Sequence, residues 1–119
     1  MARYRVELYR DARGYSQVLE FFDFLRRSNP KLWAFALRLL NTLEQQGPDL
    51  RPPLAKPLKG LGAPIWELRH PSGLRLYYWQ QERTLFVVAA GEVKKGDKPD
   101  PALLEYAVAA YRESRKGVN

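Results

Sequence analysis

Two short apolar runs on either side of a tight turn constrain the fold more than any other part of the sequence. The runs cover residues 65–69 and 74–79, and a Pro-Ser-Gly turn lies between them. Two such runs joined by a short turn that contains glycine are typical of a β-hairpin. Gly73 suits the position in the turn that needs a positive φ. The sequence therefore predicts an antiparallel hairpin at residues 65–79.

The predicted register of this hairpin places two arginines opposite each other. If His70 and Leu74 flank a three-residue loop, Arg69 pairs with Arg75. Two like charges directly opposite each other destabilise a sheet by roughly 0.2–1 kcal/mol. An anion or an acidic partner between the arginines would offset this cost. Alternatively, Glu67 and solvent satisfy both arginines on an exposed face of the sheet.

The alternation of side chains along the two strands assigns them to two faces, because successive side chains point to opposite sides of a sheet. One predicted face is apolar and holds Trp66, Leu68, Leu74, Leu76 and Tyr78. The other predicted face is polar and holds Glu67, Arg69, Arg75 and Tyr77.

The composition excludes several classes of protein. The 119 residues are predicted to form one domain spanning 1–119, and they include no cysteine and one histidine. Disulfides and thiolate metal sites are therefore excluded, and no metal site is expected. No apolar run reaches transmembrane length, and the N-terminal residues alternate charged and apolar side chains, unlike a signal peptide. We expect a cytoplasmic protein that does not associate with a membrane.

The positive charge is concentrated in one part of the chain. The net charge is +7, and residues 51–75 hold five positive and one negative side chain. A basic excess concentrated in one loop and hairpin indicates contact with a polyanion, most often RNA or DNA. A surface charge that only keeps the protein in solution would be spread more evenly along the chain.

The remaining periodicity predicts an α+β fold. An N-terminal strand and an αα-hairpin pack on a mainly antiparallel four-stranded sheet, and a C-terminal helix follows. The proline-rich segment 48–64 is predicted to be a loop that carries Lys56 and Lys59. The other predicted elements are a strand at 3–10, helices at about 17–27 and 30–46, a strand at 84–90 and a helix at about 101–115, with Ser16 and Asp100 as N-caps and Pro30 as a first helical residue.

The common catalytic motifs are missing from the sequence. It contains no glycine-rich phosphate-binding motif and no pattern that indicates a serine triad. The remaining chemistry is a set of arginines, lysines, carboxylates and tyrosines. Such a set can catalyse phosphoryl transfer within RNA without a metal or any other cofactor, because the substrate supplies the attacking 2′-hydroxyl and cations stabilise the charge that develops on the phosphate.

Several motifs, in their order along the chain, resemble the RelE/HigB-like toxins. The closest likeness is to the phage-derived, HigB-like branch of the RelE/ParE toxin superfamily. The motifs are the Lys-x-Leu-x-Gly loop, Trp-Glu-Leu-Arg, Gly-x-Arg-Leu-x-Tyr, a hydrophobic strand and a Lys-Lys loop before the last helix, at residues 56–60, 66–69, 73–77, 86–91 and 94–99.

This resemblance implies the toxin of a type II toxin–antitoxin system. Such a toxin is a metal-independent endoribonuclease that cleaves mRNA, usually on the ribosome, through attack by the 2′-hydroxyl, and a small DNA-binding antitoxin, expected to be a helix-turn-helix protein, neutralises it. By position, Arg75 matches the arginine that contacts the scissile phosphate, with Arg69 and Lys94 assisting. The resemblance assigns RNA binding to Lys56, Lys59, Lys95 and Tyr77.

Two departures from the family pattern leave the general acid and base open. Ile65 and Glu67 stand where some members have lysines, and Glu92 stands near the place of an aromatic residue. The candidates for proton transfer are Glu67, Glu92, His70, Tyr77 and Tyr111. Two other functions fit the same cationic face. One is a non-catalytic RNA- or ribosome-binding protein of the same fold, and the other is a module whose arginine pair docks an acidic antitoxin helix.

Overall fold

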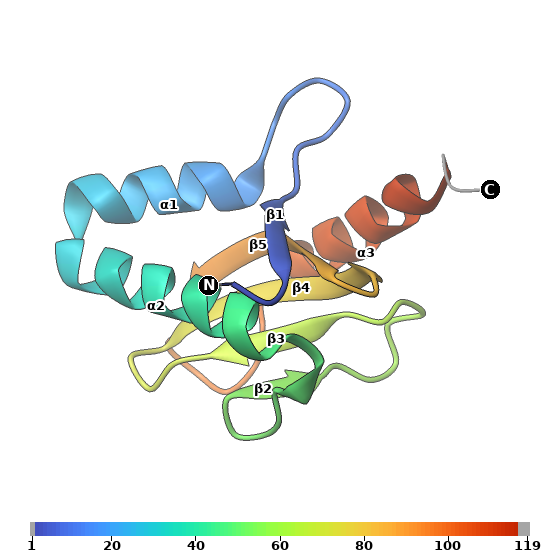
Figure 1. Cartoon of the computed structure of the whole chain (residues 1–119). Coiled ribbons are helices and arrows are strands. Elements are labelled where there is room, and N and C mark those ends of the chain that lie inside the picture. The colour runs from blue at the N-terminus through green and yellow to red at the C-terminus, as the bar shows by residue number, and fades with distance from the viewer. Residues whose placement is uncertain (1, 117–119) are drawn as a thin grey trace.

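The computed structural model describes residues 2–116, which form three α-helices packed on the two faces of a five-stranded sheet (Figure 1). This arrangement confirms the predicted α+β class. In chain order the elements are β1 (Arg5–Leu8), α1 (Gln17–Ser28), α2 (Pro30–Gln46), the 3₁₀ helix η1 (Gly47–Asp49), β2 (Ala55–Pro57), β3 (Trp66–Arg69), β4 (Leu74–Glu82), β5 (Leu85–Val93) and α3 (Pro101–Lys116). None of these helices is long and apolar enough to cross a membrane.

The sheet is mainly antiparallel, and its strands follow the order β1-β5-β4-β3-β2. Only the pairing of β1 with β5 is parallel among the described strands. The prediction of four strands is wrong by one, because β2 lies within the segment predicted to be a loop. This strand is three residues long, so it has too few positions to show alternation, and it ends at Pro57. A proline is tolerated there because β2 is an edge strand.

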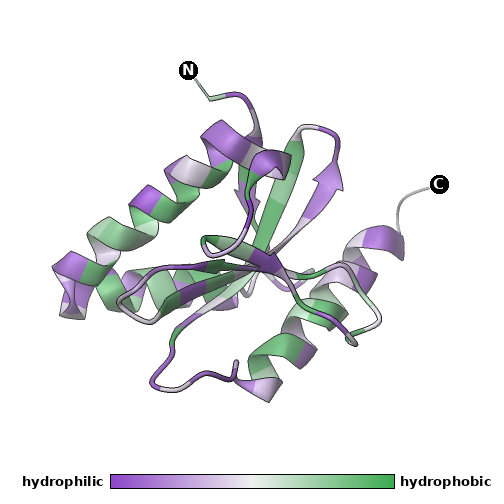
Figure 2. Cartoon of the chain, turned by 90° about the horizontal axis from the view of Figure 1, so that it is seen from below, coloured by the Kyte–Doolittle hydropathy of each residue, from purple (hydrophilic) through white to green (hydrophobic). Residues whose placement is uncertain are grey.

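The three helices cover both faces of the sheet (Figure 2). The helices α1 and α2 pack on the face that carries the predicted apolar row of the hairpin, together with Phe86 and Val88. The helix α3 packs on the opposite face, where Val87 and Ala89 of β5 are buried. The polar face of the hairpin is therefore not an exposed face, which the alternative interpretation of the arginine pair had assumed.

The helix ends follow from the predicted caps. The Ser16 Oγ accepts a hydrogen bond from the Leu19 backbone nitrogen at 3.2 Å, and Pro30 begins α2. The Asp100 carboxylate accepts from the Ala102 backbone nitrogen at 2.9 Å at the start of α3. These side chains satisfy donors that the first turn of a helix leaves free, so they fix where each helix begins.

The hairpin has the predicted register, with Arg69 opposite Arg75. Gly73 closes its turn with a φ of 100°, and a Cβ at this position would lie 2.5 Å from the Lys94 carbonyl oxygen. The Lys94 backbone nitrogen also donates to the Gly73 carbonyl at 2.7 Å. Glycine is therefore required both by the turn and by the close approach of the chain that follows β5.

The strand β5 continues to Val93, beyond the predicted end at residue 90. The predicted charged loop therefore begins later, and Glu92 lies on the sheet, opposite Arg75. The side chain of Gln17 fixes this end of β5, because its amide exchanges two hydrogen bonds with the backbone of Gly91, at 3.0 and 2.8 Å.

Candidate functional site

The register of the sheet gathers polar residues from four strands on the face that α3 covers. Arg69, Arg75 and Glu92 form one row across β3, β4 and β5. Lys56 and Tyr77 both lie opposite Glu67, which gives a second row across β2, β3 and β4. Side chains directly opposite each other point to the same face, so the two rows form one patch next to the hairpin turn.

Glu67 lies at the centre of this patch and is fully buried. Its carboxylate lies 3.2 Å from the Lys94 Nζ, 3.3 Å from the Arg69 Nε and 3.9 Å from the Arg75 Nε. We call these three cationic side chains the cationic cluster. Glu67 therefore compensates the two opposed arginines from inside the protein, as one of the two interpretations of the hairpin expected, but in a buried rather than a solvated setting.

The cationic cluster carries more positive than negative charge. One buried carboxylate faces three cations, and the only other carboxylate in the two rows is Glu92. A buried charge is costly unless it is paired, and a surplus of one sign attracts a mobile ion of the other sign. We call the solvent-exposed part of the cluster, at Arg69, its outer side. An anion that approaches this side would be stabilised.

The two arginines differ in how tightly they are held. The Arg75 Nη1 donates to the backbone carbonyls of His70 and Leu74 at 2.7 and 2.8 Å, and the side chain is only 12% exposed. The Arg69 side chain is 35% exposed. Its Nε lies 3.3 Å from the Glu67 carboxylate but forms no hydrogen bond with the described residues. Arg75 is therefore a fixed group, and Arg69 is the more accessible one.

Lys94 is an interior residue with a side chain that is 3% exposed. Its Nζ donates to the Glu67 carboxylate at 3.2 Å and to the Asp97 carbonyl at 2.8 Å. These bonds tie the segment after β5 to the sheet. The structure brings Lys94, Arg69 and Arg75 to the same carboxylate, but the Lys94 side chain is less exposed than either arginine.

Tyr77 is also buried, so this placement does not fit the predicted contact with RNA. Its hydroxyl donates to the Glu92 carboxylate at 2.6 Å and lies 3.4 Å from Glu67. Burial, followed by the hydrogen bond to Glu92, raises the pKa of Tyr77 far above its ordinary value, so the hydroxyl stays protonated. The Asp100 backbone nitrogen donates to the same Glu92 oxygen at 3.0 Å. Glu92 therefore connects β4 to the start of α3.

The three other predicted RNA-binding residues are all exposed. Lys56 lies on β2 opposite Glu67, Lys59 lies in the loop after β2, and Lys95 follows Lys94. Their ammonium groups form no ion pair with the described residues. Exposed lysines can bind phosphates by charge without fixed geometry.

The remaining candidates for proton transfer lie apart from one another. Tyr111 packs on Trp79 with ring centroids 5.5 Å apart, and the Arg115 guanidinium lies over the Tyr111 ring, 5.3 Å from its centroid. The ring of His70 stacks on Phe35 of α2. The sequence did not predict this contact, because no local pattern links residues 35 and 70.

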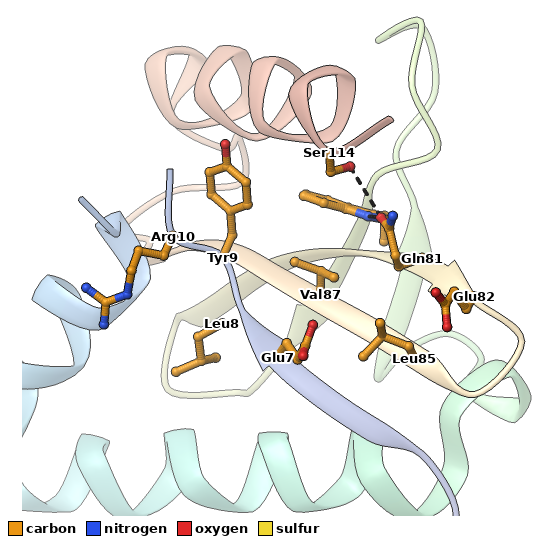
Figure 3. A pocket seen from close by; sticks show the side chains of 10 residues that line it. Glu7, Leu8, Tyr9, Arg10, Gln81, Glu82, Leu85, Val87 and Ser114 are labelled. Atoms are coloured by element: carbon orange, nitrogen blue, oxygen red, sulfur yellow. Dashed lines mark hydrogen bonds between the residues drawn. The ribbon is translucent and has the colours of Figure 1, made fainter. Parts of the chain in front are cut away.

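A separate hollow of about 570 Å³ lies at the other end of β4 (Figure 3). Its lining includes Tyr9, Gln81 and Ser114, and the Ser114 Oγ donates to the Gln81 side chain at 3.3 Å. No member of the cationic cluster lines this hollow. Among residues 2–116, no group of His, Asp and Glu side chains is arranged to hold a metal ion.

Comparison with solved structures defines the class of fold. The YoeB dimer from Staphylococcus aureus matches with a TM-score of 0.60 and 16% identity, over 78% of this chain and 99% of that chain. A YoeB/ParE toxin from Agrobacterium tumefaciens gives 0.59 and 16%, over 76% and 98%. The YoeB–YefM complex from S. aureus gives 0.59 and 17%, over 78% and 99%. The chain has the fold of these toxins.

A family model places the chain more narrowly. The model described as phage derived protein Gp49-like (DUF891) matches residues 23–112, which is most of the sequence. The chain therefore belongs to the phage-derived Gp49-like family, in agreement with the resemblance to the phage-derived branch of the superfamily. No curated protein matches the sequence.

Proposed function

We propose that the chain is the toxin of a type II toxin–antitoxin system and a metal-independent endoribonuclease that cleaves mRNA on the ribosome. The observation that carries this proposal is the cationic cluster. Three cations from β3, β4 and the segment after β5 converge on one carboxylate, in a fold shared with the YoeB and ParE toxins.

In this proposal the scissile phosphate lies against the outer side of the cluster. Arg75 stabilises the charge that develops on the phosphate oxygens, because two backbone carbonyls already hold its guanidinium in place. Arg69 supplies a second, more accessible guanidinium. Lys94 acts as a positioning residue, since its ammonium group holds Glu67, and Glu67 in turn faces both arginines.

The 2′-hydroxyl of the RNA attacks the phosphorus while the bond from phosphorus to the 5′-oxygen breaks, which gives a 2′,3′-cyclic phosphate and a 5′-hydroxyl. A protein group must remove the proton of the 2′-hydroxyl, and the leaving 5′-oxygen takes up a proton from that protonated group or from water. Of the five candidates, Glu67 and Tyr77 are buried, and Tyr111 packs on Trp79. The His70 ring stacks on Phe35, and its Nδ1 already accepts a hydrogen bond from the Ser72 backbone nitrogen. Glu92 is half-buried beside Arg75, and its Oε2 is fixed by two hydrogen bonds while Oε1 has no partner among the described residues. We therefore assign the general base to Glu92.

The exposed lysines and a partner protein complete the proposal. Lys56, Lys59 and Lys95 bind backbone phosphates on either side of the cleaved bond.

A cognate small DNA-binding antitoxin, of the helix-turn-helix type, blocks this surface in the resting cell. One of the similar structures is a YoeB–YefM complex, which supports a protein partner for this fold. The site of action is the cytoplasm, where mRNA and ribosomes are found.

A second candidate function is a non-catalytic RNA- or ribosome-binding protein. The burial of Lys94 and Tyr77 favours it, because two of the predicted functional groups are closed to a substrate. In that case the exposed lysines and Arg69 bind RNA, and the buried network only supports the fold.

A cleavage assay separates the two functions. The protein is added to programmed ribosomes carrying a defined mRNA and to the free mRNA, each with and without EDTA. Cuts in the ribosomal A-site codon that persist in EDTA and disappear with Arg75→Ala support the ribonuclease. Arg83→Ala is the matched control, since Arg83 is exposed in the β4–β5 turn at the opposite end of the strands. Intact mRNA together with measurable ribosome binding would establish the binding protein instead.

A further inference from the structure

The rings of His70 and Phe35 form a stack at the turn between β3 and β4, next to the cationic cluster. Their centroids lie 4.1 Å apart, and their planes are inclined by 25°. Phe35 belongs to α2 and His70 to the turn, so the stack lies where the α2 layer meets the end of the sheet. Both side chains are only half-buried, so part of the stack is open to solvent.

The turn holds the imidazole ring in a fixed orientation. The Ser72 backbone nitrogen donates to the His70 Nδ1 at 3.1 Å, and the Ser72 Oγ lies 2.8 Å from the same nitrogen. Because Nδ1 accepts a hydrogen bond, the ring proton of the neutral form is assigned to Nε2. A ring that is already ordered loses little conformational entropy when a second ring stacks on it.

Two guanidinium groups lie next to the stack. The Arg38 guanidinium lies 5.9 Å from the centre of the Phe35 ring. The Arg75 Nη1 donates to the His70 carbonyl at 2.7 Å. Burial, followed by the charges of Arg38 and Arg75, lowers the pKa of His70, so the ring is neutral near pH 7. The result is a neutral aromatic surface with one permanent cation next to Phe35 and another next to His70.

We propose that this stack is a binding site for one unpaired nucleobase of RNA, which lies on the His70 ring while its flanking phosphates face Arg38 and Arg75. Proteins bind single-stranded nucleic acid by combining aromatic rings with a positively charged path for the backbone. The cations alone would favour a phosphate, and the rings alone would favour an apolar group; both together suit a nucleotide. This site rests on the proposed function, because it specifies the nucleotide next to the phosphate at Arg75.

Binding of an uncleavable RNA tests the site without requiring catalysis. The probe is a short, fluorescently labelled single-stranded RNA with 2′-O-methyl groups, used intact and with one abasic nucleotide at each position in turn. The full chain is compared with His70→Ala, with His70→Phe, which keeps an aromatic ring, and with Phe24→Ala. Phe24 is the control because its ring is 58% exposed on α1, outside the stack. Circular dichroism confirms that each variant is folded.

The expected result has two parts. His70→Ala weakens binding of intact RNA by roughly 5- to 100-fold, whereas His70→Phe and Phe24→Ala bind as the wild type does. One abasic position weakens binding to the wild type but has no further effect on His70→Ala. The site is overturned if His70→Ala keeps the wild-type preference for intact RNA, or if His70→Phe loses as much affinity as His70→Ala.

The same measurements separate failure of the nucleobase site at His70 from failure of the proposed function. A wild-type protein that cleaves mRNA on the ribosome but does not distinguish intact from abasic RNA overturns the nucleobase site alone. A wild-type protein that prefers intact RNA but never cleaves mRNA overturns the proposed ribonuclease activity and supports the nucleobase site.

Discussion

Arg69 and Arg75 lie directly opposite each other on β3 and β4, and both Nε atoms face the buried carboxylate of Glu67, at 3.3 and 3.9 Å. The carboxylate occupies the position that an external anion would take between two opposed guanidinium groups. The protein therefore keeps the arginines together without any external ligand. In the proposed function, the incoming phosphate meets a site whose geometry is already set.

Removing the charge of Glu67 should destabilise the fold. Glu67→Gln keeps the size of the side chain but leaves three neighbouring cations without their buried counter-ion. Because breaking a buried ion pair from one side is costly, we expect the free energy of unfolding to fall by about 3–5 kcal/mol. Urea unfolding measures this change. Asp23→Asn, which removes a pair with Arg26 on the surface of α1, should leave the midpoint almost unchanged, and an equal loss in both variants would contradict the central role of Glu67.

Arg75 should contribute to stability through its geometry as well as its charge. Arg75→Lys keeps the charge, but its side chain is shorter and has one nitrogen, so it cannot reach the backbone carbonyls of the turn as Nη1 does while also placing a nitrogen where Nε faces Glu67. Hydrogen bonds from charged groups contribute about 1.5–3 kcal/mol each, so we expect a clear decrease in Tm. Arg69→Lys, at a more exposed position without such bonds among the described residues, should change Tm less. Equal decreases would show that the backbone bonds of Arg75 contribute nothing to stability.

The exposed lysines should act on RNA binding through charge alone. For single strands the slope of log K against log salt is about −0.7 per neutralised phosphate, so each of Lys56→Ala, Lys59→Ala and Lys95→Ala should reduce the slope by roughly 0.7. Fluorescence anisotropy across a salt series measures the slope. Arg83→Ala removes an exposed charge at the far end of the strands and should leave the slope unchanged. A lysine variant that behaves like Arg83→Ala lies outside the RNA path.

The single histidine offers a direct probe of the proposed nucleobase site. Only His70 can give an imidazole signal in the NMR spectrum, and its folded pKa is lowered from the ordinary 6.5 by burial, Arg38 and Arg75. The midpoint of its titration should therefore lie below 6.5. Arg38→Gln removes one of the causes and should move the midpoint upward, whereas Arg83→Gln should not. A midpoint at or above the ordinary value would contradict the described surroundings of the ring.

The sign of this shift also sets how His70 affects stability. The unfolded chain binds the proton with ordinary affinity and the folded chain binds it more weakly, so protonation favours the unfolded state. The contribution of the neutral His70 ring to the free energy of unfolding is present in full above pH 6.5. It is lost as the pH falls through the lowered pKa of the folded state. Urea unfolding from acid to neutral pH should show this loss in the wild type and not in His70→Phe.

Tyr77 should support the fold and take no part in proton transfer. Its hydroxyl bridges Glu92 and Glu67, and its pKa is raised, so it remains protonated at any pH where the RNA is intact. We expect Tyr77→Phe to lower the free energy of unfolding by about 1–3 kcal/mol because the carboxylates lose a buried donor. The pH dependence of cleavage should keep its shape. A changed pH profile in Tyr77→Phe would return Tyr77 to the list of acid–base candidates.

Local patterns were sufficient to predict the hairpin and the helix ends. The alternation of apolar residues and the position of Gly73 determine the register of β3 and β4, and Ser16 and Asp100 mark where α1 and α3 begin. These features depend on residues close together in the sequence, so the sequence alone contains the information. The gathering of Arg69 with Arg75 followed directly from that register.

The features that the sequence did not predict depend on contacts between distant residues. Tyr77 is buried in the cluster that includes α3, from the end of the chain, and Glu67 is buried against Lys94, from the segment after β5. The stack of His70 on Phe35 joins the turn to α2. No periodicity within either segment indicates which surface the other will cover, and for the same reason β2 was assigned to a loop.

The short strand β2 has a consequence for how copies of the chain meet. A sheet edge with free backbone donors and acceptors can recruit a strand from another molecule and so lead to aggregation. At this edge only three residues are presented, one of them is the exposed Lys56, and Pro57 has no amide hydrogen to donate. A second molecule that approached edge to edge would meet a repelling charge and an incomplete ladder. The proline-rich segment thus acts as a gatekeeper that keeps the hairpin from extending its sheet into a neighbouring molecule.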